Sequence, residues 1–184
     1  TDTATDDPWS PDAMVWPLME VIDAHCSQNW CKPLAVHLGH FEAGDEKELR
    51  QGRRYAVTRR LAGLFASYSR QRPQLLIDWE NGADGDIASD LNWQPPLWRA
   101  LIERIDADTP PHIRHAKTLT RLTESPTNLP ERLSLFGYTR LPGTEIELLD
   151  ALATHHDLHL WLPHPSDDLW QRLRGIHGQV ARRD

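Results

Sequence analysis

The chain has 184 residues, a formal net charge of −7 and two cysteines. This length suits one domain or one and a half, the acidic balance excludes a general nucleic-acid binder, and two cysteines do not make a disulfide scaffold. No stretch approaches the roughly 20 consecutive apolar residues that span a bilayer, so we expect a cytoplasmic protein without membrane contact.

The first two thirds of the chain are predicted to be helical. Residues 1–9 are small, acidic and proline-containing, and we expect them to be disordered or flexible. Ser10 before Pro11 is a typical helix start, and Pro73 both ends one helix and begins the next. Six helices are predicted, one from Ser10 and the others over about 32–40, 46–71, 73–82, 93–107 and 112–124.

A strand–helix–strand pattern follows the helices. Strands are predicted over 132–136 and 158–162 on either side of a helix over 144–154, and Ser166 is expected to cap a last helix. This order fits one βαβ crossover, in which a right-handed connection joins two parallel strands.

Two finer expectations concern this strand–helix–strand pattern. The side chains of Leu133, Leu135 and Phe136 are large and apolar, and we expect them to be buried in the sheet. Thr144 with Glu147 has the spacing of a capping box at the start of the helix.

These elements predict a mainly α fold with a small α/β part. The helical subdomain is expected over residues 10–126 and the βαβ unit over residues 127–184. Two strands leave a parallel sheet incomplete, so we expect other strands to come from a longer protein.

Positive charge is concentrated in residues 45–72 of this acidic chain. Eight basic and three acidic side chains give the stretch a local charge of +5, and an arginine at the end of such a helix can contact phosphate. The alternative is a solvated helix surface whose ion pairs contribute about 0–1 kcal/mol each. The basic residues are Lys47, Arg50, Arg53, Arg54, Arg59, Arg60, Arg70 and Arg72.

No catalytic site is predicted from the residues alone. Cys26, Cys31, His37 and His40 are zinc-ligand types, but Cys-x4-Cys lies outside the tight Cys-x2-Cys spacing, so buried thiols and surface histidines are the better interpretation. The chain has no phosphate-binding loop, no catalytic carboxylate pair and no nucleophile–base couple. The four histidines 155, 156, 159 and 164 are therefore interpreted as surface residues.

Three stretches of the chain carry a family likeness: RRYAVTRRLAGLFASYSRQRPQLLIDWENG, LNWQPPLWRALIERI and LPERLSLFGYTRLPGTEIELLDALATHHDLHLWLPHP. They resemble the RecC family, the gamma chain of exodeoxyribonuclease V, which is the bacterial RecBCD helicase–nuclease. The likeness runs in order from about Val15 to about Leu173. It implies that the chain is an interior piece from the N-terminal half of a longer protein.

The resemblance implies a fold related to superfamily 1 helicases that has lost its motor function. The helices would form a subdomain inserted into a core domain, and the two strands would belong to the core sheet. By this likeness Gly137 and Tyr138 stand at the Walker B place, where a working motor needs two acids to hold Mg²⁺ and to orient water. We therefore expect no ATP hydrolysis and no cofactor in this chain, with ATP and Mg²⁺ bound only by partner motor subunits.

The resemblance also implies a contact with DNA. In the RecC family the exiting single strand passes through a tunnel and is scanned for the Chi sequence. Leu64 and Arg72 keep the family's residue types there, Gly63 and Ala66 stand where the family pattern has acids, and Arg114 or His115 would supply a further basic contact.

The function implied is that of a noncatalytic DNA-handling and scaffolding region in recombinational double-strand-break repair. The implied partners are RecB-like and RecD-like subunits with single-stranded and duplex DNA. The alternative is a helical protein-interaction module with no DNA role.

Overall fold

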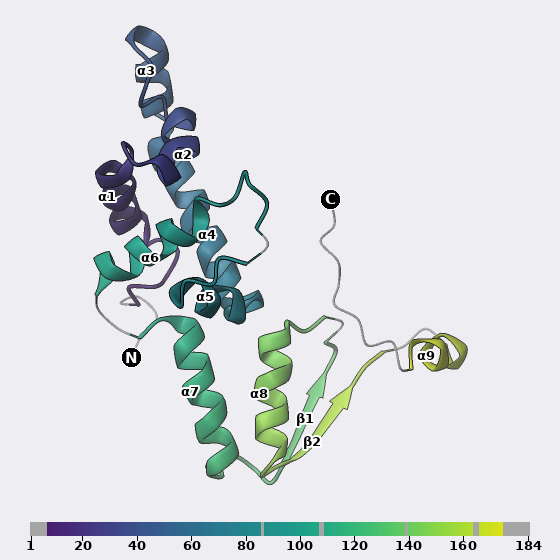
Figure 1. The fold of residues 1–184 in the computed structure, drawn as a ribbon. Helices are drawn as coiled ribbons and strands as arrows, with labels where there is room; N and C mark the ends of the chain where they lie inside the picture. Colours follow the sequence, from purple (N-terminus) through teal and green to yellow (C-terminus); the bar gives the residue numbers. More distant parts are fainter. Residues whose placement is uncertain (1–6, 86, 107–108, 139, 164–165, 175–184) are drawn as a thin grey trace.

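The computed structural model describes residues 7–85, 87–106, 109–138, 140–163 and 166–174 (Figure 1). The fold is mainly helical with a small parallel sheet, as predicted. The elements in order are α1 (Val15–His25), a short 3-10 turn (Asn29–Cys31), α2 (Lys32–His37), α3 (Gly44–Gln51), α4 (Arg54–Gln71), α5 (Pro73–Glu80), α6 (Gln94–Ile105), α7 (Pro111–Glu124), β1 (Arg132–Phe136), α8 (Gly143–Ala153), β2 (Asp157–Trp161) and α9 (Asp167–Leu173).

The helical part has a buried core between α1, α4, α5 and α6. Leu18, Phe65, Leu76 and Trp98 are fully buried there, and the rings of Phe65 and Trp98 lie 5.2 Å apart. Close packing of large side chains from these four helices gives the helical part a hydrophobic core of its own.

The chain enters this core earlier than the sequence indicated. Trp9 is 4% exposed and its ring lies 5.8 Å from that of Trp98, so the prediction of a flexible segment up to residue 9 is wrong at this position. Residues 1–6 lie outside the described residues. Ser10 caps a turn rather than the helix, because its Oγ accepts the Ala13 N–H at 3.3 Å while α1 begins at Val15.

The helix predicted over 46–71 is two helices, α3 and α4. The break lies at Gly52, whose N–H donates to the Glu48 carbonyl oxygen at 2.9 Å. Arg50 holds α3 in place: its guanidinium donates to the Val36 carbonyl oxygen at 3.0 Å and its side chain packs on Gly39. Gly39 has a φ of +71°, and a Cβ there would lie 2.7 Å from that of Arg50, so only glycine fits this contact.

The two strands form a parallel pair in the register Leu133 with Leu158 and Phe136 with Trp161. Because side chains alternate along a strand, the leucines face α8 while Phe136 and Trp161 point to the opposite face. Phe136 is 67% exposed, so the prediction that it is buried is wrong. Leu133 and Leu135 are half-buried.

The predicted capping box at the start of α8 is also wrong. No side chain caps this helix, and the Thr144 hydroxyl instead donates to the Arg70 carbonyl oxygen at 2.7 Å. Glu147 accepts from His115, with its Oε2 2.8 Å from Nε2. Both residues therefore join α8 to the helical part. The cap predicted for α9 is confirmed, since Ser166 Oγ accepts the Leu169 N–H at 3.1 Å.

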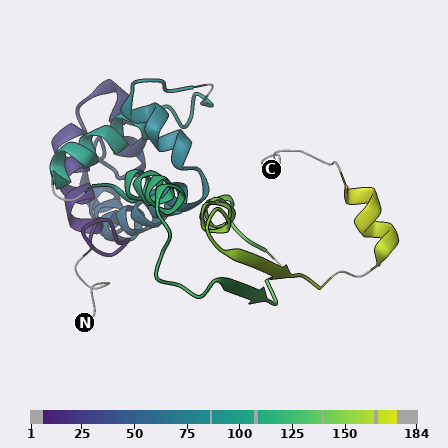
Figure 2. The ribbon, with the colours of Figure 1, turned by 90° about the horizontal axis from the view of Figure 1, so that it is seen from below.

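Helix α7 connects the two parts. It packs against α4 and α5 and lies beside α8, as both Figure 1 and Figure 2 show. Among the described helices, none combines the length and the apolar character that crossing a bilayer requires.

Candidate nucleic-acid interface

Two of the predicted site residues, Leu64 and Arg72, lie in one groove of about 460 Å³. The groove is formed by the C-terminal half of α4, by α5, by the loop before α6 and by the first residue of α6. Its lining is mixed, with apolar, aromatic and polar side chains. The residues that line it are Leu64, Ser67, Tyr68, Gln71, Arg72, Leu75, Trp79, Ile87, Ala88, Leu91 and Gln94.

Arg72 occupies the corner between α4 and α5. The following residue, Pro73, disfavours helical backbone at Arg72, which has φ −143° and ψ 56°. The Arg72 N–H still closes the last turn of α4 by donating to the Tyr68 carbonyl oxygen at 2.8 Å. The side chain is exposed, and no carboxylate in the described part of the chain pairs with it. Its guanidinium is therefore available to an anion outside the chain.

Tyr68 and Trp79 form the aromatic floor of the groove. Their rings meet edge to face with centroids 5.8 Å apart, and the Tyr68 hydroxyl donates to Gln94 Oε1 at 3.2 Å. These contacts fix the tyrosine ring, because its apolar body and its polar tip both have partners. Leu64 is half-buried and packs against the core, so it supports the groove wall.

The structure does not bring Arg114 and His115 into this groove. Both lie on α7, where Arg114 Nη2 is 2.7 Å from Asp7 Oδ2 and His115 Nε2 is 2.8 Å from Glu147 Oε2. These pairs tie α7 to the N-terminal segment and to α8. The four predicted residues therefore divide into two that share a groove and two that join elements.

Several arginines of the basic stretch are ion-paired. Arg50 pairs with Glu46, Arg54 with Asp23, and Arg59 with Asp12 at 3.6 Å. In the described part, the basic side chains without such a pair are Lys47, Arg53, Arg60, Arg70 and Arg72. Of these, Arg72 lines the groove, so one unpaired positive charge remains at its rim.

Some groove residues were not identified from the sequence. Ile87 and Leu91 come from a loop that reads as acidic and polar, and Gln94 opens the next helix. Their distance along the chain from Arg72 leaves no local signal, because only tertiary packing places that loop against α4. Tyr68 did carry a signal, since it belongs to the Tyr-x3-Arg-Pro run.

Gly137 and Tyr138 follow β1 in an open turn. Gly137 has a φ of +78°, which glycine adopts readily, and its N–H approaches the Trp161 carbonyl oxygen at 3.4 Å. Tyr138 is 44% exposed and lines a second cavity, of about 410 Å³, between α8 and β2.

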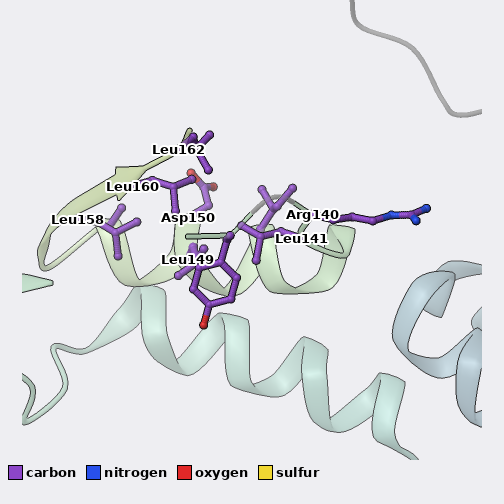
Figure 3. A pocket seen from close by; sticks show the side chains of 10 residues that line it. Arg140, Leu141, Leu149, Asp150, Leu158, Leu160 and Leu162 are labelled. Carbon is purple, nitrogen blue, oxygen red and sulfur yellow. The ribbon is translucent and has the colours of Figure 1, made fainter. Parts of the chain in front are cut away.

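That second cavity is mostly apolar (Figure 3). Leu149 from α8 and Leu158 and Leu160 from β2 form its wall, while the Arg140 side chain extends away from these leucines. Asp150 is the one carboxylate in its described lining. The lining therefore lacks the pair of acids that a nucleotide-bound Mg²⁺ requires.

The cysteines and histidines do not converge on a metal site. Burial raises the pKa of both thiols, that of Cys31 to about 12, and the two thiols contact one another. Among the described residues, no group of three or more ligand-type side chains could hold a metal ion. The prediction of surface histidines is wrong for His156, which is 8% exposed and lies 2.9 Å from both the Pro130 carbonyl oxygen and Thr127 Oγ1. His164 lies outside the described residues.

Comparison with known proteins identifies the family. A family model described as "RecC, N-terminal domain" matches residues 1–182, so the chain belongs to the RecC family. Three similar proteins are each named RecBCD enzyme subunit RecC. The relative from Mycolicibacterium smegmatis is 71% identical over all 184 residues, the one from Mycobacterium tuberculosis 63% over 179, and the one from Haemophilus influenzae 27% over 205 aligned positions.

The chain is much shorter than these relatives. It is covered fully by the first alignment and to 97% and 98% by the other two, but it spans only 16%, 16% and 18% of the relatives' own lengths. The likeness to the RecC family, expected from the three sequence stretches, is confirmed.

Proposed function

We propose that this chain is a noncatalytic DNA-handling and scaffolding region of a RecC-like subunit of exodeoxyribonuclease V. It acts in recombinational double-strand-break repair, in a complex with RecB-like and RecD-like subunits. Family membership supports the subunit assignment. The groove between α4 and α5 supports the contact with DNA.

The single observation that carries the DNA contact is the unpaired Arg72 guanidinium at the rim of an aromatic-floored groove. Proteins that hold single strands combine positive charge, which follows the phosphates, with aromatic or apolar surfaces, on which bases stack. Arg72 supplies the charge, and Leu64, Tyr68 and Leu75 supply the surface. In the complex this groove contacts the exiting single strand during the scanning for Chi.

In this proposal Arg114 and His115 have a structural role. Arg114 pairs with Asp7 and His115 with Glu147, and these contacts hold α7 in place. They position the helical part against α8, and a strand contact at either residue requires its ion pair to open first. Gly63 has open space around its Cβ position, so the absence of an acid there is not forced by crowding.

We also propose that the βαβ unit belongs to an inactive helicase-like core. The parallel strand pair and the turn that follows β1 without a carboxylate support this. The chain then hydrolyses no ATP, and ATP and Mg²⁺ belong to the partner motor subunits. A magnesium-dependent ATPase rate that disappears on mutation within residues 132–164 would contradict this.

The DNA contact is tested by crosslinking single-stranded DNA in the assembled complex. Adducts are expected within residues 64–72, and Arg72→Ala should weaken strand binding about tenfold, the effect of one lost phosphate or base contact. Arg70→Ala is the matched control, because Arg70 is exposed at the end of the same helix but does not line the groove. If the two substitutions weaken strand binding equally, or if no adduct forms within residues 64–72, the proposal is wrong.

A second candidate function is a helical protein-interaction module. Exposed aromatic side chains at the starts of α1 and α4 and between α2 and α3 favour it. Trp16 is 62% exposed beside Tyr55, and Phe41 is 60% exposed. Tryptophan and tyrosine are frequent in the energetically dominant parts of protein interfaces. If Trp16→Ala breaks assembly with the partner subunits while Arg72→Ala leaves strand binding unchanged, this second function is favoured.

A further inference from the structure

Cys26 and Cys31 form a pair of thiols at the junction of α1 and α2. Cys26 directly follows α1, and Cys31 directly precedes α2. Two successive turns fold the residues between them. The Gln28 N–H donates to the His25 carbonyl oxygen at 2.9 Å, and the Cys31 N–H donates to the Gln28 carbonyl oxygen at 3.1 Å. These turns bring the two side chains together, and the thiols share a hydrogen bond.

Both thiols lie in the hydrophobic core of the helical part, but they differ in access. Cys31 is 0% exposed, whereas Cys26 is 7% exposed and lines a cavity of about 210 Å³. The described lining of this cavity includes His40 and the ion-paired side chains of Asp23 and Arg54, so the cavity is partly polar. A small polar molecule therefore reaches Cys26 before Cys31.

The two thiols also differ in how readily they ionise. Burial raises the pKa of both, and the hydrogen bond between them opposes this rise at Cys26. At Cys31 the nearby Cys26 sulfur and the same hydrogen bond raise the pKa further, to about 12. Because the thiolate is the nucleophile, Cys26 reacts first. Since the pKa of both thiols is raised, the reaction is slow at neutral pH, and the pair stays reduced until an oxidant persists.

We propose that Cys26 and Cys31 are a modification site, at which a hydroperoxide converts the two thiols into a reversible intramolecular disulfide. With hydrogen peroxide, the Cys26 sulfur attacks one oxygen, so that an S–O bond forms, the O–O bond breaks and one water leaves. The Cys31 sulfur then attacks the sulfur of the Cys26 sulfenic acid, the S–S bond forms, and a second water leaves with the Cys31 proton. The thiols are oxidised by two electrons, and the peroxide is reduced by two.

The neighbouring thiol distinguishes this site from a single buried cysteine. A sulfenic acid without a thiol in reach is oxidised further to sulfinic acid, which is in general not reversible. Here Cys31 already contacts Cys26, so the disulfide forms without a movement of α1 or α2. It closes the short loop over residues 26–31 and joins the two helices covalently, which restricts the opening of their junction.

The test is peptide mapping of full-length RecC that is oxidised with hydrogen peroxide while folded and then alkylated in denaturant. No Lys or Arg lies between Cys26 and Cys31, so trypsin leaves both in one peptide. This peptide is expected to lose two hydrogens, to carry no alkyl group, and to regain two alkylatable thiols after dithiothreitol. Two alkylated thiols after prolonged oxidation, or oxygen retained on either sulfur, would overturn the proposal.

Single variants of the same full-length protein test the order of the two steps. In Cys31→Ser the Cys26 sulfenic acid has no thiol to attack it, so a dimedone adduct should accumulate at Cys26. In Cys26→Ser the fully buried Cys31 should be labelled several-fold more slowly. Equal labelling rates in the two variants would contradict the order. The peptide map of the parent protein needs no substitution, so it decides the proposal whether or not a variant folds.

Hydrogen exchange of the reduced and the oxidised parent protein measures the consequence for the fold. Exchange over residues 26–38 should slow several-fold in the disulfide form, because the junction of α1 and α2 opens less often. Helix α8, in the βαβ part, is the internal control and should exchange at the same rate in both forms. Equal or faster exchange over residues 26–38 after oxidation would show that the disulfide does not fasten the junction.

Discussion

The helical part and the βαβ part differ in where their apolar side chains lie. All the buried apolar residues of the described chain fall between Trp9 and Leu101, apart from Ala151. The βαβ part instead exposes Phe136 and Trp161 on one face of its sheet and Leu160 on the other. The helical part therefore has a core that holds its groove in shape, whereas the sheet depends on what packs against it.

The largest expected effect concerns matched leucine substitutions in the two parts. Leu97→Ala should lower the free energy of unfolding by about 2–5 kcal/mol, because Leu97 is fully buried and the change leaves a cavity. Leu133→Ala should cost about 1 kcal/mol, since Leu133 is half-buried. Urea denaturation of both variants measures the difference, and equal losses would contradict the comparison.

The next effect concerns the link between α7 and the sheet. His156→Ala removes contacts to Thr127 and Pro130 and should cost about 1–3 kcal/mol locally, because buried polar groups lose their partners. Hydrogen exchange should accelerate in residues 127–131 and β1 and stay unchanged in α4. Thr154→Ala, at an exposed residue in the same turn, is the control; an equal acceleration there would show that His156 does not hold the link.

A smaller effect separates two buried tryptophans of the helical core. Trp98 Nε1 donates to Glu80 Oε1 at 3.1 Å, while Trp79 Nε1 is buried without an acceptor among the described residues. Trp98→Phe should therefore destabilise the protein by about 1 kcal/mol more than Trp79→Phe, which removes an unsatisfied donor. Thermal or urea unfolding of the two variants gives the order, and the reverse order would be inconsistent with these hydrogen bonds.

The last effect is a pH dependence of the helical part. His112 is fully buried beside Trp98, with Nε2 2.6 Å from Glu80 Oε1 but not aligned for a hydrogen bond. Burial lowers the pKa of His112 below its ordinary 6.5, against the opposing effect of Glu80. The unfolded imidazole thus takes up a proton at higher pH than the folded one. The contribution of neutral, buried His112 to the free energy of unfolding is therefore fully present above pH 6.5. It declines as the pH falls from 6.5 toward the lower pKa of the folded state.

Urea denaturation above and below pH 6.5 measures this dependence. In His112→Gln the decline between the two conditions should be smaller, because the side chain that titrates is gone. A variant whose stability falls with pH as steeply as that of the parent protein would assign the effect to other groups.

Local signals predicted much of the fold. The bounds of β1 match the structure, and Pro73 begins α5 as expected, because strand alternation and proline act through their immediate neighbours. The break between α3 and α4 was not predicted. It depends on Arg50 reaching back to Gly39 and Val36, a contact between helices that no local pattern encodes.

A contact of the candidate site residues with DNA stays a prediction, and the structure shows only where these residues lie. The family likeness identified Leu64 and Arg72, which share a groove, but it grouped them with Arg114 and His115, which lie elsewhere in ion pairs. Phe136 was misjudged because its neighbours are apolar, although alternation along the strand places it opposite Leu135. The face that a residue occupies, more than its type, decides its exposure.

The hydrogen bond from Thr144 to the Arg70 carbonyl oxygen has a mechanical consequence. It fastens α8, the crossover helix of the sheet, to the last turn of α4, two residues before the corner that carries Arg72. A movement of α8 away from α4 would break this hydrogen bond, so the position of the βαβ part is coupled to the helix end that lies beside the groove.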